Sequence, residues 1–128
     1  MRSAVEIIEL SGNLTAISGM NFPDRVRKLV KPGTQKLLLD LSAVSFVDSA
    51  GLSGLVRLYK IAQGAGIQLA LCSISEQLSQ LFRLTSMDSV FEIFRDKEDF
   101  YCFWRRQFPS DAVVAQLEDL AVASLNVE

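Results

Sequence analysis

The stretch that decides the fold is Ser45-Phe46-Val47-Asp48-Ser49-Ala50-Gly51-Leu52. An apolar run over residues 37–41 leads into it, and an amphipathic pattern with helical spacing begins near Ala50 and leads away from it. A buried strand followed by a helix places a carboxylate, a hydroxyl and a glycine at their junction.

Two interpretations of Asp48 and Ser49 follow from this junction. Backbone N–H groups in the first turn of a helix lack partners within the helix, and aspartate and serine are favoured there because their side chains cap them. In one interpretation the two residues only cap the helix. In the other, Ser49 accepts a phosphate, because the positive end of the helix dipole favours negative charge at that position.

Further strands and helices are expected on both sides of this junction. Alternating apolar residues predict a first strand over residues 5–10, and the turn signal Ser11-Gly12-Asn13 predicts a hairpin with a short second strand over residues 14–17. Asn21 is expected to cap the next helix, with Pro23 in its first turn.

Downstream, apolar runs over residues 67–72 and 90–94 predict two more strands, and helical patterns follow each of them. Because strands alternate with helices, the sequence predicts an α/β domain with a mostly parallel central sheet, an N-terminal hairpin strand and flanking helices.

The C-terminal segment, residues 109–128, carries apolar residues near helical spacing. We expect a helix here that covers apolar surface of its own domain. The alternative is that the same stripe makes a homodimer or partner contact.

Composition excludes several classes of function. The 128 residues suffice for one core, 49% of them are hydrophobic, and the net charge of −2 includes no basic block, so we expect no direct nucleic-acid binding. No signal-peptide pattern and no apolar stretch of about 20 residues occurs, which predicts no membrane span. With two cysteines and no Cys-x-x-Cys, a reduced, cytoplasmic setting is expected.

Catalysis is not expected of this chain. The sequence contains no histidine, which removes the Ser-His-Asp and Cys-His mechanisms and the commonest metal ligand. No glycine-rich phosphate loop opens a helix after a strand, which disfavours a nucleotide binder. We therefore expect no cofactor and no metal, and we interpret Cys72 as a core residue.

Taken together, the order of elements and one motif resemble the STAS domain, and more narrowly the bacterial anti-sigma factor antagonists. The residues that carry the resemblance are the strand and its exit over residues 37–44, the motif over residues 46–52, and the helix over residues 55–60. The resemblance spans residues 4–105 and leaves residues 106–128 as a C-terminal helical extension. Ala50 stands where many antagonists have a second hydroxyl residue, which leaves Ser49 as the sole hydroxyl of the motif core.

The resemblance implies a mechanism for the whole protein. Ser49 matches the serine that a cognate anti-sigma factor, itself a serine protein kinase, phosphorylates in this family. The unphosphorylated antagonist binds that factor and frees the sigma factor, phosphorylation releases it, and a serine phosphatase restores it. The expected partner contacts are Phe46, Val47, Asp48, Ala50, Gly51, Ser53 and Arg57. The alternative function is a non-phosphorylated STAS scaffold or regulator of a transport or signalling complex.

Overall fold

The computed structural model describes residues 5–16, 21–107 and 122–128. Its elements in chain order are β1 (Val5–Leu14), α1 (Phe22–Leu29), β2 (Lys36–Val47), α2 (Ser49–Gly64), β3 (Gln68–Cys72), α3 (Glu76–Thr85), the short 3₁₀ helix η1 (Met87–Ser89), β4 (Glu92–Phe94), α4 (Lys97–Gln107) and β5 (Val122–Asn126).

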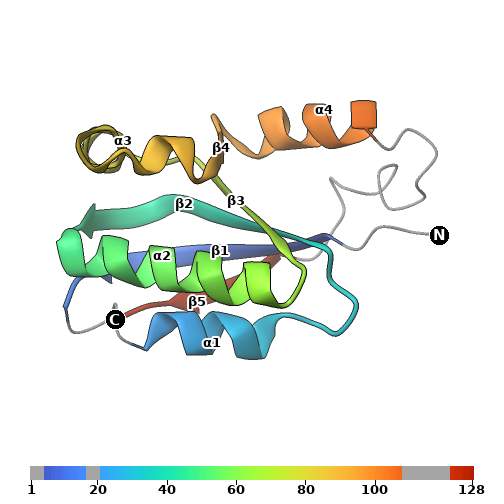
Figure 1. Ribbon diagram of the computed structural model, residues 1–128, viewed down its shortest axis with the longest axis horizontal. Helices are drawn as coiled ribbons and strands as arrows, with labels where there is room; N and C mark the ends of the chain where they lie inside the picture. The colour runs from blue at the N-terminus through green and yellow to red at the C-terminus, as the bar shows by residue number, and fades with distance from the viewer. Residues whose placement is uncertain (1–4, 17–20, 108–121) are drawn as a thin grey trace.

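The strands form one five-stranded sheet in the order β4-β3-β2-β1-β5 (Figure 1). Every neighbouring pair is parallel. Parallel strands must be joined by crossovers, and the helices between β1 and β4 supply them. The predicted α/β class with a parallel sheet is therefore confirmed.

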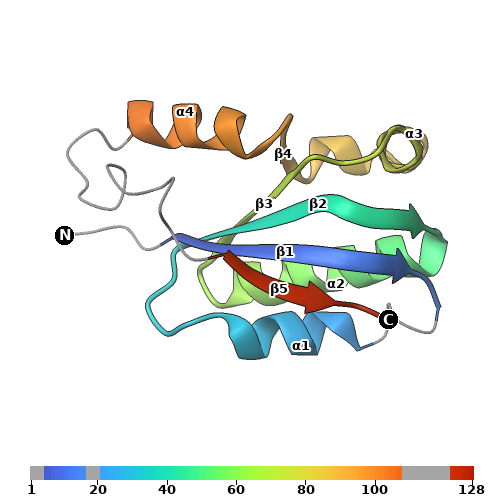
Figure 2. The same cartoon turned by 180° about the vertical axis from the view of Figure 1, so that it is seen from behind.

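Helices cover both faces of the sheet. Figures 1 and 2 show α2 on one face, in front of the strands in the first view and behind them in the second. α1 belongs to the same layer, because its Phe22 and Val26 share a hydrophobic core with α2. α3 joins this layer, because Leu78 and Phe82 belong to the same hydrophobic core as Leu55 of α2. The opposite face is covered by α4, whose Phe100 and Trp104 share a second core with residues of β1, β2 and β3.

The prediction of an N-terminal hairpin is wrong. β1 runs without reversal from Val5 to Leu14 and pairs in parallel with β2 along this length. The turn signal at Ser11-Gly12-Asn13 marks an irregularity within the strand, with register shifts between Glu9 and Ser11 and between Gly12 and Asn13. Gly12 has a φ of 96°, a conformation that glycine adopts without a Cβ clash, so the glycine serves a bulge rather than a turn.

The segment before Asp48 belongs to the preceding strand. Residues 42–47, beyond the apolar run over residues 37–41, continue β2 as far as Val47. They remain extended because the far end of β1 pairs with them, with Leu14 opposite Val47. The strand therefore delivers the chain directly to Asp48.

The C-terminal residues correct another expectation. Residues 122–126, expected in a helix, form β5 and pair in parallel with β1. Pairing along β1 satisfies the backbone groups of that edge, which outweighs the helical spacing of the apolar residues. The rest of this stretch of the expected helix, residues 109–121, lies outside the described residues. The domain boundary at residue 105 and a dimer contact through the extension remain predictions.

Candidate functional site

The candidate site is the junction between β2 and α2. Asp48 is the N-cap of α2, and its Oδ1 accepts a hydrogen bond from the backbone N–H of Gly51 at 2.8 Å. The backbone N–H of Asp48 donates to the carbonyl oxygen of Leu14 at 3.1 Å. Asp48 therefore closes the first turn of α2 and ties it to the end of β1, so the turn is held from both sides.

Ser49 is the first residue of α2 and is exposed. Its carbonyl oxygen accepts a hydrogen bond from Ser53 Oγ at 3.1 Å. The Ser49 hydroxyl itself has no hydrogen-bond partner among residues 5–16, 21–107 and 122–128. Asp48 therefore provides the cap of α2. Modification of the Ser49 hydroxyl would break no hydrogen bond to the described residues.

Gly51 explains why the first turn of α2 lies so close to β1. A Cβ atom at this position would lie 2.1 Å from the carbonyl oxygen of Leu14 and 2.6 Å from its carbonyl carbon. No side chain fits at that distance from a backbone group, so only glycine allows this approach. Gly51 is buried, and its role in the structure is to bring α2 against the end of β1.

The residues expected to contact a partner separate into three groups by exposure. Val47 is 1% exposed and Gly51 is buried, so neither offers a side chain to a partner in this structure. Ala50 and Asp48 are half-buried. The remaining three are exposed: Phe46, at 46%, stands next to the junction, and Ser53 and Arg57 follow Ser49 at intervals of four residues on one face of α2.

Gln77 of α3 is a site residue that sequence reasoning missed. Its Nε2 donates to the carbonyl oxygen of Val47 at 2.6 Å, and its Oε1 accepts from the backbone N–H of Val47 at 3.2 Å. β3 ends at Cys72, opposite Asp40, and so does not reach Val47. The Gln77 amide takes the place of the absent strand. No local sequence signal marks it, because a glutamine early in a helix resembles any solvated position.

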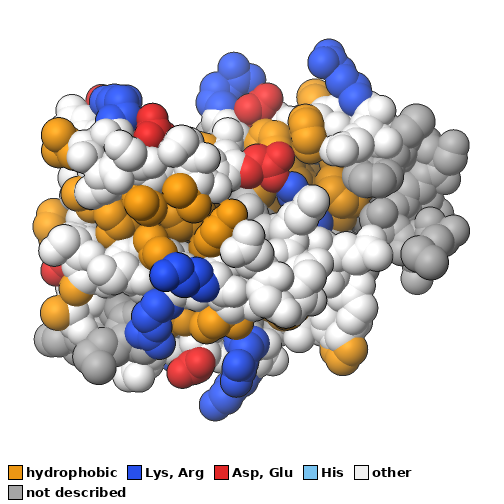
Figure 3. Space-filling model, in the orientation of Figure 1, with side chains coloured by type: hydrophobic (Ala, Val, Ile, Leu, Met, Phe, Trp, Pro, Cys, Tyr) orange, Lys and Arg blue, Asp and Glu red, His pale blue; other side chains and the backbone are white. Residues whose placement is uncertain are grey.

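Hydrophobic side chains gather on the surface between α2 and α3, with lysine or arginine side chains beside them (Figure 3). Partly buried hydrophobic residues of α2, α3 and the neighbouring η1 include Val56, Tyr59, Leu81 and Met87. Such a surface next to an exposed serine offers apolar contact area to a partner protein.

Polar groups on the opposite face of the sheet have structural partners. Asp40 is 3% exposed, lies 3.5 Å from Lys97 Nζ of α4 and accepts a hydrogen bond from the backbone N–H of Ser42 at 3.0 Å. The neighbouring Cys72 is buried, as expected. Burial and the charge of Asp40 raise the pKa of the Cys72 thiol to about 12, so it stays protonated at neutral pH.

Metal binding and membrane insertion find no support in the described part of the chain. Within residues 5–16, 21–107 and 122–128, no group of three or more acidic or cysteine side chains is placed to hold a metal ion. Among the same residues, none of the helices has the length and apolar character needed to cross a bilayer.

Comparison with known families identifies the fold. The sequence model of the STAS domain matches residues 2–100. The chain belongs to the STAS domain family. The matched residues include the β2–α2 junction, so Asp48 and Ser49 lie within this STAS domain.

Solved structures similar to this STAS domain come from two settings. A sulfate transporter family protein from Wolinella succinogenes matches with a TM-score of 0.62 at 17% identity, covering 91% of this chain and 88% of the other. A putative anti-sigma factor antagonist from Thermotoga maritima matches with a TM-score of 0.60 at 27% identity, covering 66% of this chain and 74% of the other.

The anti-sigma factor antagonist SpoIIAA, solved in its unphosphorylated form, has a TM-score of 0.58 at 13% identity, covering 83% of this chain and 93% of the other. The likenesses at 17% and 13% identity show the fold alone.

Proposed function

We propose that this STAS domain is an anti-sigma factor antagonist. It binds a cognate anti-sigma factor when Ser49 is unphosphorylated, and phosphorylation of Ser49 by that factor, a serine protein kinase, releases it. A serine phosphatase reverses the modification, so the cycle regulates sigma-factor-dependent transcription by partner switching. The protein acts by binding and carries out no catalysis itself.

The observation that carries the proposal is the exposed Ser49 hydroxyl beside a cap that another residue provides. Asp48 makes the capping bond to Gly51, so modification of Ser49 removes no bond that the fold uses. A kinase needs a serine that it can reach, and Ser49 is exposed at the first position of α2. This arrangement supports a regulatory serine rather than a purely structural one.

A phosphate at Ser49 would change the surface more than the fold. It adds about 1.5 to 2 negative charges at pH 7 beside Asp48, while the N-terminus of α2 offsets part of its cost. The domain therefore stays folded. A partner docked on Phe46, Ser53 and Arg57 would have to bury the part of that charge that the N-terminus of α2 does not offset, which is strongly unfavourable.

The comparisons support both candidate functions. The match to a putative anti-sigma factor antagonist at 27% identity favours the antagonist function within the family. The structure of the murine Slc26a9 anion transporter also matches at 27% identity, with a TM-score of 0.57, covering 61% of this chain and 13% of the other. A role as a transport-complex scaffold is therefore the outcome that remains if the switch fails.

The test compares charge at Ser49 with charge elsewhere. The Ser49→Ala protein is used to capture the anti-sigma factor, and calorimetry then measures its affinity for Ser49→Ala, Ser49→Asp and a control, Ser124→Asp. Ser124 is exposed on β5 at the edge of the sheet, so its variant adds the same charge away from α2. We expect Ser49→Asp to bind at least tenfold more weakly than Ser49→Ala, a loss of about 1.4 kcal/mol in binding free energy. Ser124→Asp should bind like wild type.

A phosphorylation assay completes the test. With the captured kinase and ATP, wild type and Ser53→Ala should incorporate phosphate, and Ser49→Ala should not. Equal affinities of Ser49→Ala and Ser49→Asp, or labelling that persists in Ser49→Ala, would contradict the proposal.

A further inference from the structure

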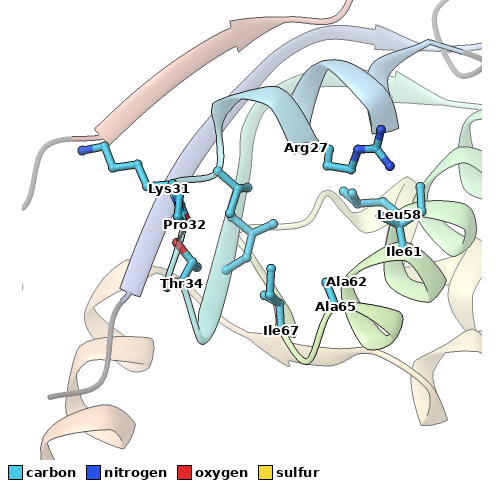
Figure 4. Close-up of a pocket in the computed structure, with 12 residues that line it drawn as sticks. Arg27, Lys31, Pro32, Thr34, Leu58, Ile61, Ala62, Ala65 and Ile67 are labelled. Carbon is cyan, nitrogen blue, oxygen red and sulfur yellow. Dashed lines mark hydrogen bonds between the residues drawn. The ribbon is translucent and has the colours of Figure 1, made fainter. Parts of the chain in front are cut away.

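A cavity of about 270 Å³ lies at the far end of α2 from Ser49. It is formed by the end of α1, the loop that leads into β2, the last turns of α2, and Ile67, which precedes β3 (Figure 4). None of the residues of the proposed switch surface lines it. Any ligand that binds there therefore acts at a second site.

The walls of the cavity are apolar. Leu37 of β2 and Leu58 of α2 form its buried base, being 1% and 2% exposed. Val30, Ile61 and Ile67 line it and are only partly buried, so their apolar surface faces the open space. A hydrocarbon that covers this surface gains free energy in proportion to the area it removes from water.

The charges at the rim have a single sign. Arg27 and Lys31 line the cavity, and no acidic residue does. Within the described part of the chain, neither cation forms an ion pair. Figure 4 shows the two residues on opposite sides of the cavity, with Arg27 beside Leu58 and Ile61 and with the Lys31 side chain extending away from the other lining residues.

We propose that this cavity binds a single-chain fatty acid, with the alkyl chain on the apolar walls and the carboxylate on Arg27. The planar guanidinium of arginine matches a carboxylate through two parallel N–H donors. Lys31, across the opening, adds positive potential. The volume is just below the usual range of small-molecule sites, about 300–1,000 Å³, which favours one alkyl chain over the two chains of a phospholipid.

The test is a titration of the isotope-labelled full chain with decanoate, below its micelle concentration, followed by amide NMR. We expect saturable shifts confined to residues around the cavity, including Val30, Ile61 and Ile67. Decylamine carries a chain of similar length with the opposite charge and should bind at least tenfold more weakly, and acetate, which has no chain, should produce no saturable shift.

Three variants separate the contributions of head group and chain. Arg27→Ala should weaken decanoate binding about tenfold, and Lys31→Ala about threefold. The matched control is Lys28→Ala, which removes an exposed charge from the same helix without changing the cavity lining, and it should bind like wild type. Ala65→Leu places a larger side chain at an exposed position of the rim and should block binding while leaving the fold intact.

The outcome is independent of the switch at Ser49, because Ser49→Ala should bind decanoate with wild-type affinity. The proposal is wrong if decanoate produces no saturable shifts at the cavity, or if Arg27→Ala and Lys28→Ala weaken binding equally. It is also wrong if decylamine binds as well as decanoate. Flotation with phosphatidylglycerol vesicles in the absence of a decanoate response would assign the surface to a membrane lipid and likewise overturn it.

Discussion

The two strand-to-helix junctions at the same end of the sheet use serine in opposite ways. Between β2 and α2 the single connecting residue, Asp48, is the cap, and its Oδ1 accepts from Gly51 N–H at 2.8 Å. Between β3 and α3 three residues intervene, and Ser75 is the cap, with its Oγ accepting from Leu78 N–H at 3.1 Å. The Ser75 hydroxyl is occupied by the fold, whereas the Ser49 hydroxyl is not.

The difference shows what makes a serine at a helix start suitable for regulation. Both serines have the composition of a cap, and local sequence alone does not separate them. The separation comes from the neighbouring residue. Where an aspartate already satisfies the first turn, the hydroxyl of the adjacent serine is available for modification.

The largest effect is expected from Gly51→Ala, which tests whether the β2–α2 junction depends on close approach. The new methyl group would collide with the Leu14 carbonyl, so we expect a loss of about 3 kcal/mol or more in the free energy of unfolding, measured by urea denaturation. Gly64→Ala, at the end of the same helix with open space at its Cβ, should be neutral or stabilising by up to about 1 kcal/mol. Similar losses for both variants would refute the close-approach explanation.

Next in size is the support that α3 gives to the first junction. Gln77→Ala leaves the N–H and C=O of Val47 without their partners, and we expect a loss of about 1–3 kcal/mol. Gln80→Ala, one turn along the same helix at an exposed position, should change stability by less than about 0.5 kcal/mol. If the two variants unfold at the same urea concentration, Gln77 does not support the end of β2.

The two caps themselves should have equal value. Asp48→Ala and Ser75→Ala each remove one capping bond, and each should cost about 1 kcal/mol, within the usual range of about 0.5–2. Thermal or urea unfolding measures both. If Ser75→Ala is as stable as wild type, Ser75 does not act as a stabilising cap, and the contrast with Ser49 fails.

The smallest effect is expected from Ser49→Ala, which tests whether the Ser49 hydroxyl has a structural role. Ser49→Ala removes a hydroxyl that bonds to none of the described residues, so the free energy of unfolding should change by less than about 0.5 kcal/mol. A loss as large as that of Ser75→Ala would mean that Ser49 contributes to capping, and the contrast between the junctions would disappear.

Local patterns in the sequence were sufficient to locate the switch candidate. The apolar run over residues 37–41 and the helical spacing after Ala50 predicted the strand and the helix, and both are confirmed. The position of Ser49 at the start of α2 followed from these two patterns. Such features depend on interactions between residues close in sequence, which a single chain displays directly.

Features that depend on distant segments were missed or misread. Gly12 reads as a turn residue, and only pairing with β2 makes it a bulge. Residues 122–126 read as helix, and only the open edge of β1 makes them a strand.

By itself, then, the sequence determined the α/β class, the parallel sheet, the strand-to-helix junction and the serine at its start. Tertiary structure alone decided which residues around that serine reach solvent. Val47 and Gly51 share the motif with Ser49, yet Leu14 and Gln77, from distant parts of the chain, enclose them. The physical reason is that burial and backbone hydrogen bonding depend on which elements pack together, and a local sequence pattern does not show which distant elements do so.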